Sequence, residues 1–115
     1  MIYVILAVVI VYAAFKILLS RPDVSPAKVK ELLSNGGKLI DVRTVSEFRN
    51  GHIKGAINLP LESLPNGVHR IDISSDTPLL LCCASGMRSG QAKRLLKKAG
   101  YTSVLNAGSV SSLNR

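Results

Sequence analysis

The sequence predicts a small α/β domain with a parallel sheet, preceded by one membrane-spanning helix. Two observations lead to this prediction. Short apolar runs alternate with segments of helical periodicity, which is typical of a parallel α/β sheet. A separate apolar run at residues 2–19 is long enough to cross a bilayer. A chain of 115 residues leaves room for little more than one small domain.

The run at residues 2–19 contains one charged side chain, Lys16. As a helix it would span roughly 27 Å, close to the thickness of the bilayer hydrocarbon. A cleaved secretion signal and a buried core helix are the alternatives. The run lacks the basic start of a secretion signal, and Leu19-Ser20-Arg21-Pro22 is a poor cleavage site. Because it is apolar on all faces, we predict a membrane anchor at residues 1–20.

Positive charge near this run lies on its C-terminal side. The positive-inside rule therefore predicts a single-pass protein whose following domain is cytoplasmic. The basic residues concerned are Lys16, Arg21, Lys28 and Lys30.

The chain has 15 basic and 7 acidic residues, a net charge of +8. Nucleic-acid binding is disfavoured, because the chain has no aromatic stacking platform and no nucleic-acid motif. Attraction to anionic lipid headgroups or small anionic substrates fits a tethered cytoplasmic domain better. Two adjacent cysteines in a reducing compartment do not indicate a structural disulfide.

The predicted polar linker covers residues 21–24, and the domain covers residues 25–115. Ser25 and Pro26 are typical of a helix N-cap and first helical position. Asn35-Gly36-Gly37 ends that helix. A strand is predicted over residues 38–43.

A short helix follows at residues 44–49, where Thr44 and Glu47 match a capping box. The next strand covers residues 56–59 and ends at Pro60. Residues 61–68 are predicted to form a short helix or turn.

The third strand is predicted at residues 78–82, whose leucines lack alternation, as expected for a strand covered on both faces. A helix is predicted over residues 89–99 and a final strand at residues 104–105, followed by a short polar end. The predicted core positions of that helix are Ala92, Leu95, Leu96 and Ala99.

Cys83 stands between the third strand and the following helix, at the edge of a parallel sheet where sites form. Free N–H groups at a helix start favour a thiolate over a thiol and can hold an oxyanion. Arg88, five positions after Cys83, is suited to bind an anion, because its planar guanidinium can donate hydrogen bonds to two oxygens at once. The alternative for Arg88 is to hold the loop by pairing with an Asp or with backbone carbonyls.

Three segments together resemble the rhodanese family of sulfurtransferases, as a single-domain member. They are Leu39-Ile40-Asp41-Val42-Arg43 with Glu47-Phe48; Gly51-His52-Ile53-Lys54-Gly55-Ala56-Ile57-Asn58-Leu59-Pro60; and Cys83-Ala84-Ser85-Gly86-Met87-Arg88-Ser89 with Gly100-Tyr101 and Val104-Leu105-Asn106-Ala107-Gly108. The resemblance covers roughly residues 24–114 and implies a small doubly wound α/β domain.

The resemblance implies that Cys83 carries sulfane sulfur as a persulfide, with the loop around it binding the substrate. The implied binding residues are Ala84, Ser85, Gly86, Met87, Arg88 and Ser89. Ser89 is as well suited to cap the helix. The spacing from Cys83 to Arg88 is C-x4-R, whereas related phosphatases and arsenate reductases use C-x5-R to cradle a larger oxyanion.

The predicted function is transfer of sulfur from thiosulfate or a persulfide to cyanide or a thiol. The lipid bilayer is the other predicted partner, and we expect no cofactor, no metal and no nucleic acid. The alternative is a non-catalytic, membrane-tethered module that binds partners in response to sulfur or redox state. The intact cysteine loop favours the enzyme.

Other polar residues have structural interpretations. The side chain of Cys82 should point away from that of Cys83, as a small buried hydrophobe or else a resolving thiol. In the resembled family, the residues matching Asp41 and Arg43 hold loops together. His52 suits a structural hydrogen bond. The chain departs from the family at its tail, which has no Trp.

Overall fold

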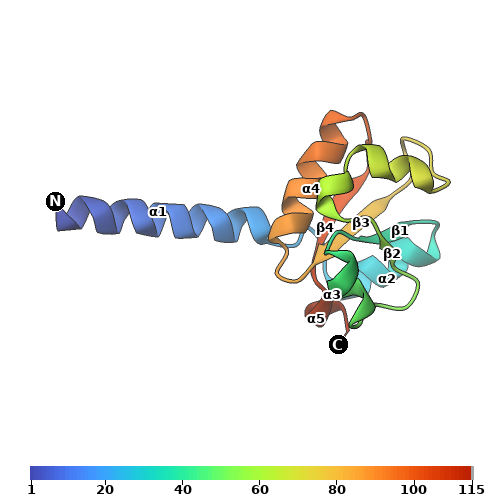
Figure 1. The fold of residues 1–115 in the computed structure, drawn as a ribbon, viewed down its shortest axis with the longest axis horizontal. Helices are drawn as coiled ribbons and strands as arrows, with labels where there is room; N and C mark the ends of the chain where they lie inside the picture. Colours follow the sequence, from blue (N-terminus) through green and yellow to red (C-terminus); the bar gives the residue numbers. More distant parts are fainter. Residues whose placement is uncertain (115) are drawn as a thin grey trace.

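The computed structural model describes residues 1–114, so the last residue of the predicted domain, 115, lies outside the described part. A long N-terminal helix, α1 (Ile2–Ser20), projects from an α/β domain (Figure 1). In α1 an 18-residue window has a mean hydropathy of 2.7 and none of it is buried. The helix is thus long and apolar enough to span a membrane, as a secretion signal can also be.

The domain is built on a parallel sheet in the order β2-β1-β3-β4. Because the chain places β2 on one side of β1 and then β3 and β4 on the other, the strand order reverses between β1 and β3. Ligand sites of open α/β sheets form at such a switch point. The strands are β1 (Lys38–Asp41), β2 (Ile57–Asn58), β3 (Leu79–Cys83) and β4 (Val104–Ser109).

Helices cover both faces of the sheet, which confirms the doubly wound α/β prediction. On one face, α4 (Met87–Lys98) packs with the segment of 3₁₀ helices η1 (Leu61–Ser63) and η2 (Asn66–Arg70). On the other face lie α2 (Pro26–Ser34) and the short α5 (Val110–Leu113). The β3 strand is buried along its whole length, as its run of leucines predicts.

Local sequence signals explain the helix starts. Ser25 accepts a hydrogen bond from the backbone N–H of Lys28 and so caps α2, with Pro26 in the first turn. Thr44 and Glu47 form the expected capping box at α3 (Val45–Arg49). These two predictions are confirmed.

Several predicted boundaries are wrong. The first strand ends at Asp41, the second has only two residues, and the third runs one residue further, so that it includes Cys83. The last strand extends to Ser109 because it pairs with β3 along its length, and α5 replaces the expected polar end.

The α4 helix begins two residues before the predicted start, because Gly86 adopts a left-handed conformation (φ 95°) and serves as its N-cap. Leu95 and Ala99 were expected in the core but are exposed. Ala92 and Leu96 alone face the sheet from the expected set, and Leu95 lies to one side with 37% of its surface exposed.

Candidate active site

The candidate nucleophile, Cys83, is the last residue of β3, beside the switch point of the sheet. Its side chain is fully buried and belongs to the core cluster on the α4 face. Cys82 belongs to the cluster on the α2 face. The two adjacent thiols therefore lie on opposite sides of the sheet, as the alternation of a strand predicts, and both are free.

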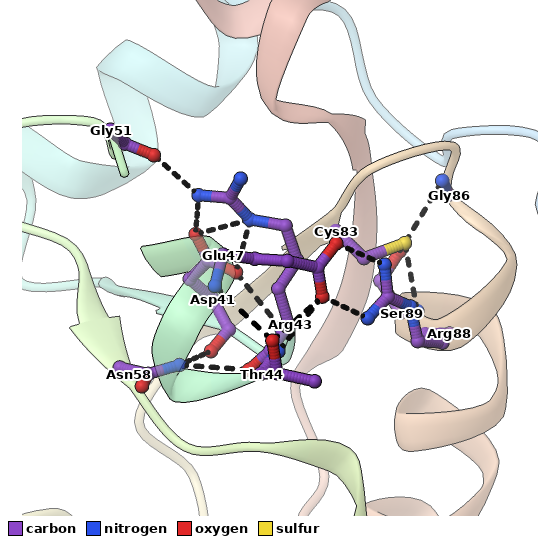
Figure 2. Close-up of polar contacts among 10 residues, drawn as sticks. All are labelled: Asp41, Arg43, Thr44, Glu47, Gly51, Asn58, Cys83, Gly86, Arg88 and Ser89. Atoms are coloured by element: carbon purple, nitrogen blue, oxygen red, sulfur yellow. Dashed lines mark hydrogen bonds and ion pairs between the residues drawn. The ribbon is translucent and has the colours of Figure 1, made fainter. Parts of the chain in front are cut away.

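The loop after β3 turns its donors toward the Cys83 sulfur (Figure 2). The N–H of Gly86 donates to Sγ at 3.0 Å, and the N–H of Ser89 approaches it at 3.4 Å. The Ser89 hydroxyl lies 3.4 Å from the same sulfur. Because Gly86 is the N-cap of α4 and Ser89 lies in its first turn, the positive end of that helix also faces the sulfur.

These contacts separate the two thiols electrostatically. Burial raises the pKa of Cys83, but hydrogen bonds from the Ser89 hydroxyl and from the N–H groups of Ser89, Ser85 and Gly86 outweigh it and leave the pKa lowered. Burial, with the nearby Asp41 and Cys83 charges, raises the pKa of Cys82 to about 12. A thiolate therefore forms far more readily at Cys83 than at Cys82.

The loop residues have different partners. Ser89 does not cap α4; its hydroxyl donates to the buried side chain of Asn106 at 2.7 Å. The Ser85 hydroxyl accepts from the N–H of Met87 at 3.4 Å. Ala84 is exposed, and Met87 is half-buried against α1. Of the predicted binding side chains, only that of Ser89 contacts Sγ in this structure.

Arg88 forms a bidentate ion pair with Glu47 of α3, at 2.6 Å and 2.9 Å (Figure 2). Each side chain is about one third exposed. Hydrogen bonds from Arg88 and from the Thr44 N–H lower the pKa of Glu47 to about 2. The alternative in which Arg88 holds the loop is thus realised with a glutamate, a role the capping-box pattern did not predict. Anion binding by Arg88 stays a prediction.

A second ion pair, which is buried, holds the end of the neighbouring strand β1. Asp41 is fully buried and pairs with Arg43 at 2.8 Å, while Arg43 also donates to the carbonyl of Gly51. Asn58 donates to the carbonyls of Asp41 and Arg43 at 3.0 Å. The hydrogen bonds of Asp41 and Arg43 run to each other and to neighbouring backbone groups, so the two residues hold the loops at this edge of the sheet.

His52 packs against a neighbouring aromatic ring and hydrogen-bonds the backbone, as a structural residue does. Its ring stacks on Phe48 with centroids 3.7 Å apart, and Nδ1 hydrogen-bonds the Phe48 carbonyl at 2.8 Å. Within residues 1–114, no group of three or more His, Cys, Asp or Glu side chains is arranged to hold a metal ion.

Asn106 of β4 is a site residue that the sequence analysis gave no role. Its side chain is 2% exposed, and its Oδ1 accepts from the Ser89 hydroxyl and from the N–H of Gly108. Its Nδ2 donates to the Gly86 carbonyl at 3.0 Å. Asn106 therefore holds two of the residues that face the sulfur. An asparagine among apolar strand residues is the signal that marks it.

Asn106 also binds the segment that follows α1. Nδ2 reaches the carbonyl of Arg21 at 3.3 Å, and the backbone of Asn106 exchanges hydrogen bonds with Asp23. Asp23 in turn accepts from Lys93 of α4 at 2.7 Å. The predicted linker is therefore tied to the same residue as the sulfur loop.

The arrangement can stabilise a negative sulfur atom in a dry site, held by N–H groups and one hydroxyl. Residues 25–112 match the family described as "Rhodanese-like domain". The chain belongs to the rhodanese-like family. The resemblance drawn from the sequence motifs is thereby confirmed, and named relatives of this rhodanese-like chain support a sulfur-transfer role at the level of the family.

Two curated relatives illustrate the match. "Uncharacterized protein YqhL" of Bacillus subtilis (strain 168) is 36% identical over 107 residues, which are 86% of this chain and 83% of the relative. "Thiosulfate sulfurtransferase PspE" of Escherichia coli (strain K12) is 38% identical over 69 residues, 60% of this chain and 66% of the relative.

Solved structures agree with the fold. The "rhodanese with anions from E. coli" is 34% identical with a TM-score of 0.63, covering 66% of this chain and 89% of its own. The "Human Single Domain Sulfurtranferase TSTD1" is 29% identical with a TM-score of 0.69, covering 80% of this chain and 94% of its own.

Proposed function

We propose that this protein is a membrane-anchored sulfurtransferase that carries sulfane sulfur as a persulfide on Cys83. The observation that supports this most is the set of polar groups around the buried Cys83 sulfur: the N–H groups of Gly86 and Ser89, which donate to it, and the Ser89 hydroxyl, which lies 3.4 Å away. They favour a thiolate despite burial. The names of several relatives support the same class of reaction.

In the proposed first step, the Cys83 thiolate attacks the outer sulfur of thiosulfate. A sulfur–sulfur bond forms, the bond within thiosulfate breaks, and sulfite leaves with the bonding electron pair. A persulfide donor reacts in the same way and releases its thiolate. The N–H groups that face Sγ stabilise the charge on the terminal sulfur of the persulfide.

In the second step, cyanide or a thiolate acceptor attacks the terminal sulfur of the persulfide. The sulfur–sulfur bond breaks, the acceptor keeps the transferred sulfur, and the Cys83 thiolate is regenerated. Because Cys83 is fully buried, reagents must reach it through the loop at residues 84–89. Arg88 belongs to this loop and forms an ion pair with Glu47. We propose that the positive charge of Arg88 attracts the anionic sulfur donor.

The decisive experiment is sulfur loading of the full chain followed by mass spectrometry of the intact protein. Wild type exposed to thiosulfate should gain the mass of one sulfur and turn over thiosulfate with cyanide. Cys83→Ser should do neither. Cys82→Ala is the matched control, since it removes the other buried thiol and should keep both properties. Absence of sulfur uptake and turnover in wild type would instead support the non-catalytic binding module.

We further propose that α1 spans a membrane once and that the domain is cytoplasmic. The observation behind this is the long, unburied apolar helix with its basic residues toward the domain. Protease treatment of right-side-out vesicles should leave the domain intact, whereas inside-out vesicles should lose it. The reverse pattern would overturn the orientation, and recovery of a chain without residues 2–20 would indicate a cleaved signal.

A further inference from the structure

The α4 helix is held directly against the C-terminal end of α1. A side chain added at Gly86 would overlap with the carbonyl oxygen of Ser20, and one added at Gly90 would overlap with that of Leu19. These two glycines therefore let the backbone of α1 approach α4 as closely as backbones can. Figure 1 shows α4 running across the end of α1, so that one side of α4 looks back along the projecting helix.

The α4 helix carries two neighbouring hollows. One lies between the helices and is lined by Tyr12, Phe15, Lys16, Leu19, Met87, Gln91 and Arg94. The other lies against η1 and is lined by Leu61, Gln91, Arg94, Leu95 and Lys98. Because Gln91 and Arg94 line both, the hollows belong to one continuous surface. We name the α4 residues Met87, Gln91, Arg94, Leu95 and Lys98 the outer face of α4.

The outer face combines positive charge with apolar contact. Positions 87, 91, 94 and 98 recur at helical spacing and so share one side of α4. Arg94 and Lys98 form no ion pair within the described residues 1–114, whereas Lys93, one step around the helix, is engaged by Asp23. None of the described residues that line the two hollows is acidic.

We propose that the outer face of α4 docks on the anionic headgroup layer of the membrane that α1 crosses, with Arg94 and Lys98 on phospholipid phosphates. This inference rests on the anchoring in the proposed function. Charge complementarity selects the lipid, because Arg94 and Lys98 line the outer face and Arg94 shares a hollow with Lys16 of α1. Apolar Leu95 and Met87 suit the boundary between headgroups and acyl chains.

The docked arrangement has a consequence for the sulfur site. Met87 belongs both to the outer face and to the first turn of α4, and only Ala84, Ser85 and Gly86 separate it from Cys83 at the end of β3. With the outer face on the headgroups, the loop that covers Cys83 lies at the membrane surface. Sulfur donors or acceptors held at the membrane surface can then reach the Cys83 site without leaving that surface.

The chain contains no Trp, so a single introduced Trp is a unique reporter. The full-length protein is reconstituted in vesicles of phosphatidylcholine with phosphatidylglycerol, containing lipid with a nitroxide on the headgroup. Gln91→Trp reports on the outer face. Lys30→Trp is the matched control, because Lys30 is exposed on α2, which covers the opposite face of the sheet. We expect strong quenching for Gln91→Trp and little for Lys30→Trp.

Val8→Trp, read with a nitroxide in the acyl chain, tests the anchor separately. Quenching of Val8→Trp together with equal quenching of Gln91→Trp and Lys30→Trp would overturn the docking and leave the anchor intact. An unquenched Val8→Trp would overturn the anchor and the docking with it. Neither result bears on sulfur uptake by Cys83, which is measured by mass.

The charge contribution has its own control. Adding Arg94→Gln and Lys98→Gln to Gln91→Trp should lower the equilibrium constant for docking on the headgroups, read from the quenching of Trp, by about fivefold per cation. This is the contribution of one basic residue near an anionic surface. Adding Lys30→Gln and Lys54→Gln, an equal loss of charge from exposed positions, should change nothing. Equal quenching in vesicles of phosphatidylcholine alone, or equal loss with both double variants, would overturn the assignment to anionic headgroups.

Discussion

At the scale of single residues, two chemically identical neighbours acquire opposite properties. Cys82 and Cys83 are both fully buried. Cys82 packs among apolar side chains near the Asp41 carboxylate, which raises its pKa, whereas Cys83 faces a hydroxyl and N–H groups. Burial alone would raise both pKa values. Orientation along the strand therefore decides which thiol is stabilised as a thiolate.

Ser89→Ala tests the hydroxyl. It removes the hydroxyl that lies 3.4 Å from Sγ, while the backbone N–H of Ser89 remains. The pKa of Cys83 should rise by about one unit, the size of one lost hydrogen bond to a charged group. Ultraviolet absorbance of the thiolate across a pH titration measures this, with Cys82 silent below its pKa of about 12.

Ser85→Ala is the matched control for this titration, since the Ser85 hydroxyl is bound to the Met87 N–H and its backbone donor is retained. Because the pKa of Cys83 is lowered from 9.0, wild-type thiolate persists below pH 9 and is lost as the pH falls through the folded value. Identical titrations for wild type and Ser89→Ala would show that the hydroxyl does not stabilise the thiolate.

At the scale of elements, Glu47 joins the start of α3 to the loop before α4. One carboxylate oxygen accepts from the N–H and hydroxyl of Thr44 and from Arg88, and the other accepts from Arg88. The pKa of Glu47 lies at about 2, below its ordinary 4.5. The contribution of the ionised Glu47 to the stability of the fold is therefore complete above pH 4.5 and is lost only as the pH falls toward 2. At neutral pH, protonation does not release Arg88.

Glu47→Gln should change how the site meets an anionic donor. The substitution leaves the Arg88 charge uncompensated beside the loop, so the KM for thiosulfate should fall by roughly threefold, the effect of one partly screened charge. Steady-state kinetics of the full chain measure this. Thr44→Ala is the control: it should cost about 1 kcal/mol of stability through the lost cap and leave KM unchanged. An increased KM in Glu47→Gln would mean that Arg88 must be held by Glu47 to act.

The elements also show which features a sequence can predict. Alternation of apolar strands and helices, the cap at Thr44 and the opposite directions of Cys82 and Cys83 follow from local rules, and the structure has all three. Leu95 was misplaced because helical spacing cannot say how wide a stripe the sheet covers.

The partners of Arg88 and Asn106 are beyond local rules, because they come from segments far apart in the chain. Glu47 lies 41 residues from Arg88, and Asp23 lies 83 residues from Asn106. Only tertiary packing brings such pairs together. The cysteine loop itself was predictable because its residues are contiguous, whereas the side chains that orient the loop were not.

At the scale of the whole molecule, the C-terminal end of α1 packs directly against the residues that surround the Cys83 site. Its last carbonyls lie against Gly86 and Gly90, and the segment after it is bound by Asn106, which also binds the Ser89 hydroxyl. A flexible tether would leave these groups to water. The packing instead fixes the direction in which α1 leaves the domain, and with it the side of the molecule on which the sulfur loop lies.

Gly90→Ala tests this fixed junction. In an ordinary helix, replacing Gly by Ala stabilises by about 1 kcal/mol. Here the new Cβ would lie closer than 3.0 Å to the Leu19 carbonyl oxygen, and a backbone carbonyl cannot rotate away. The end of α1 must then move off α4, so the free energy of unfolding should fall by about 1–3 kcal/mol. Chemical denaturation of the full chain in detergent micelles measures this, with Gln91→Ala as the control at the next, exposed position of α4.

Displacement of α1 should also loosen Asn106 and slow sulfur uptake by Cys83. A Gly90→Ala protein that is more stable than wild type would mean that α1 does not rest on α4, and that the anchor and the sulfur site are mechanically independent.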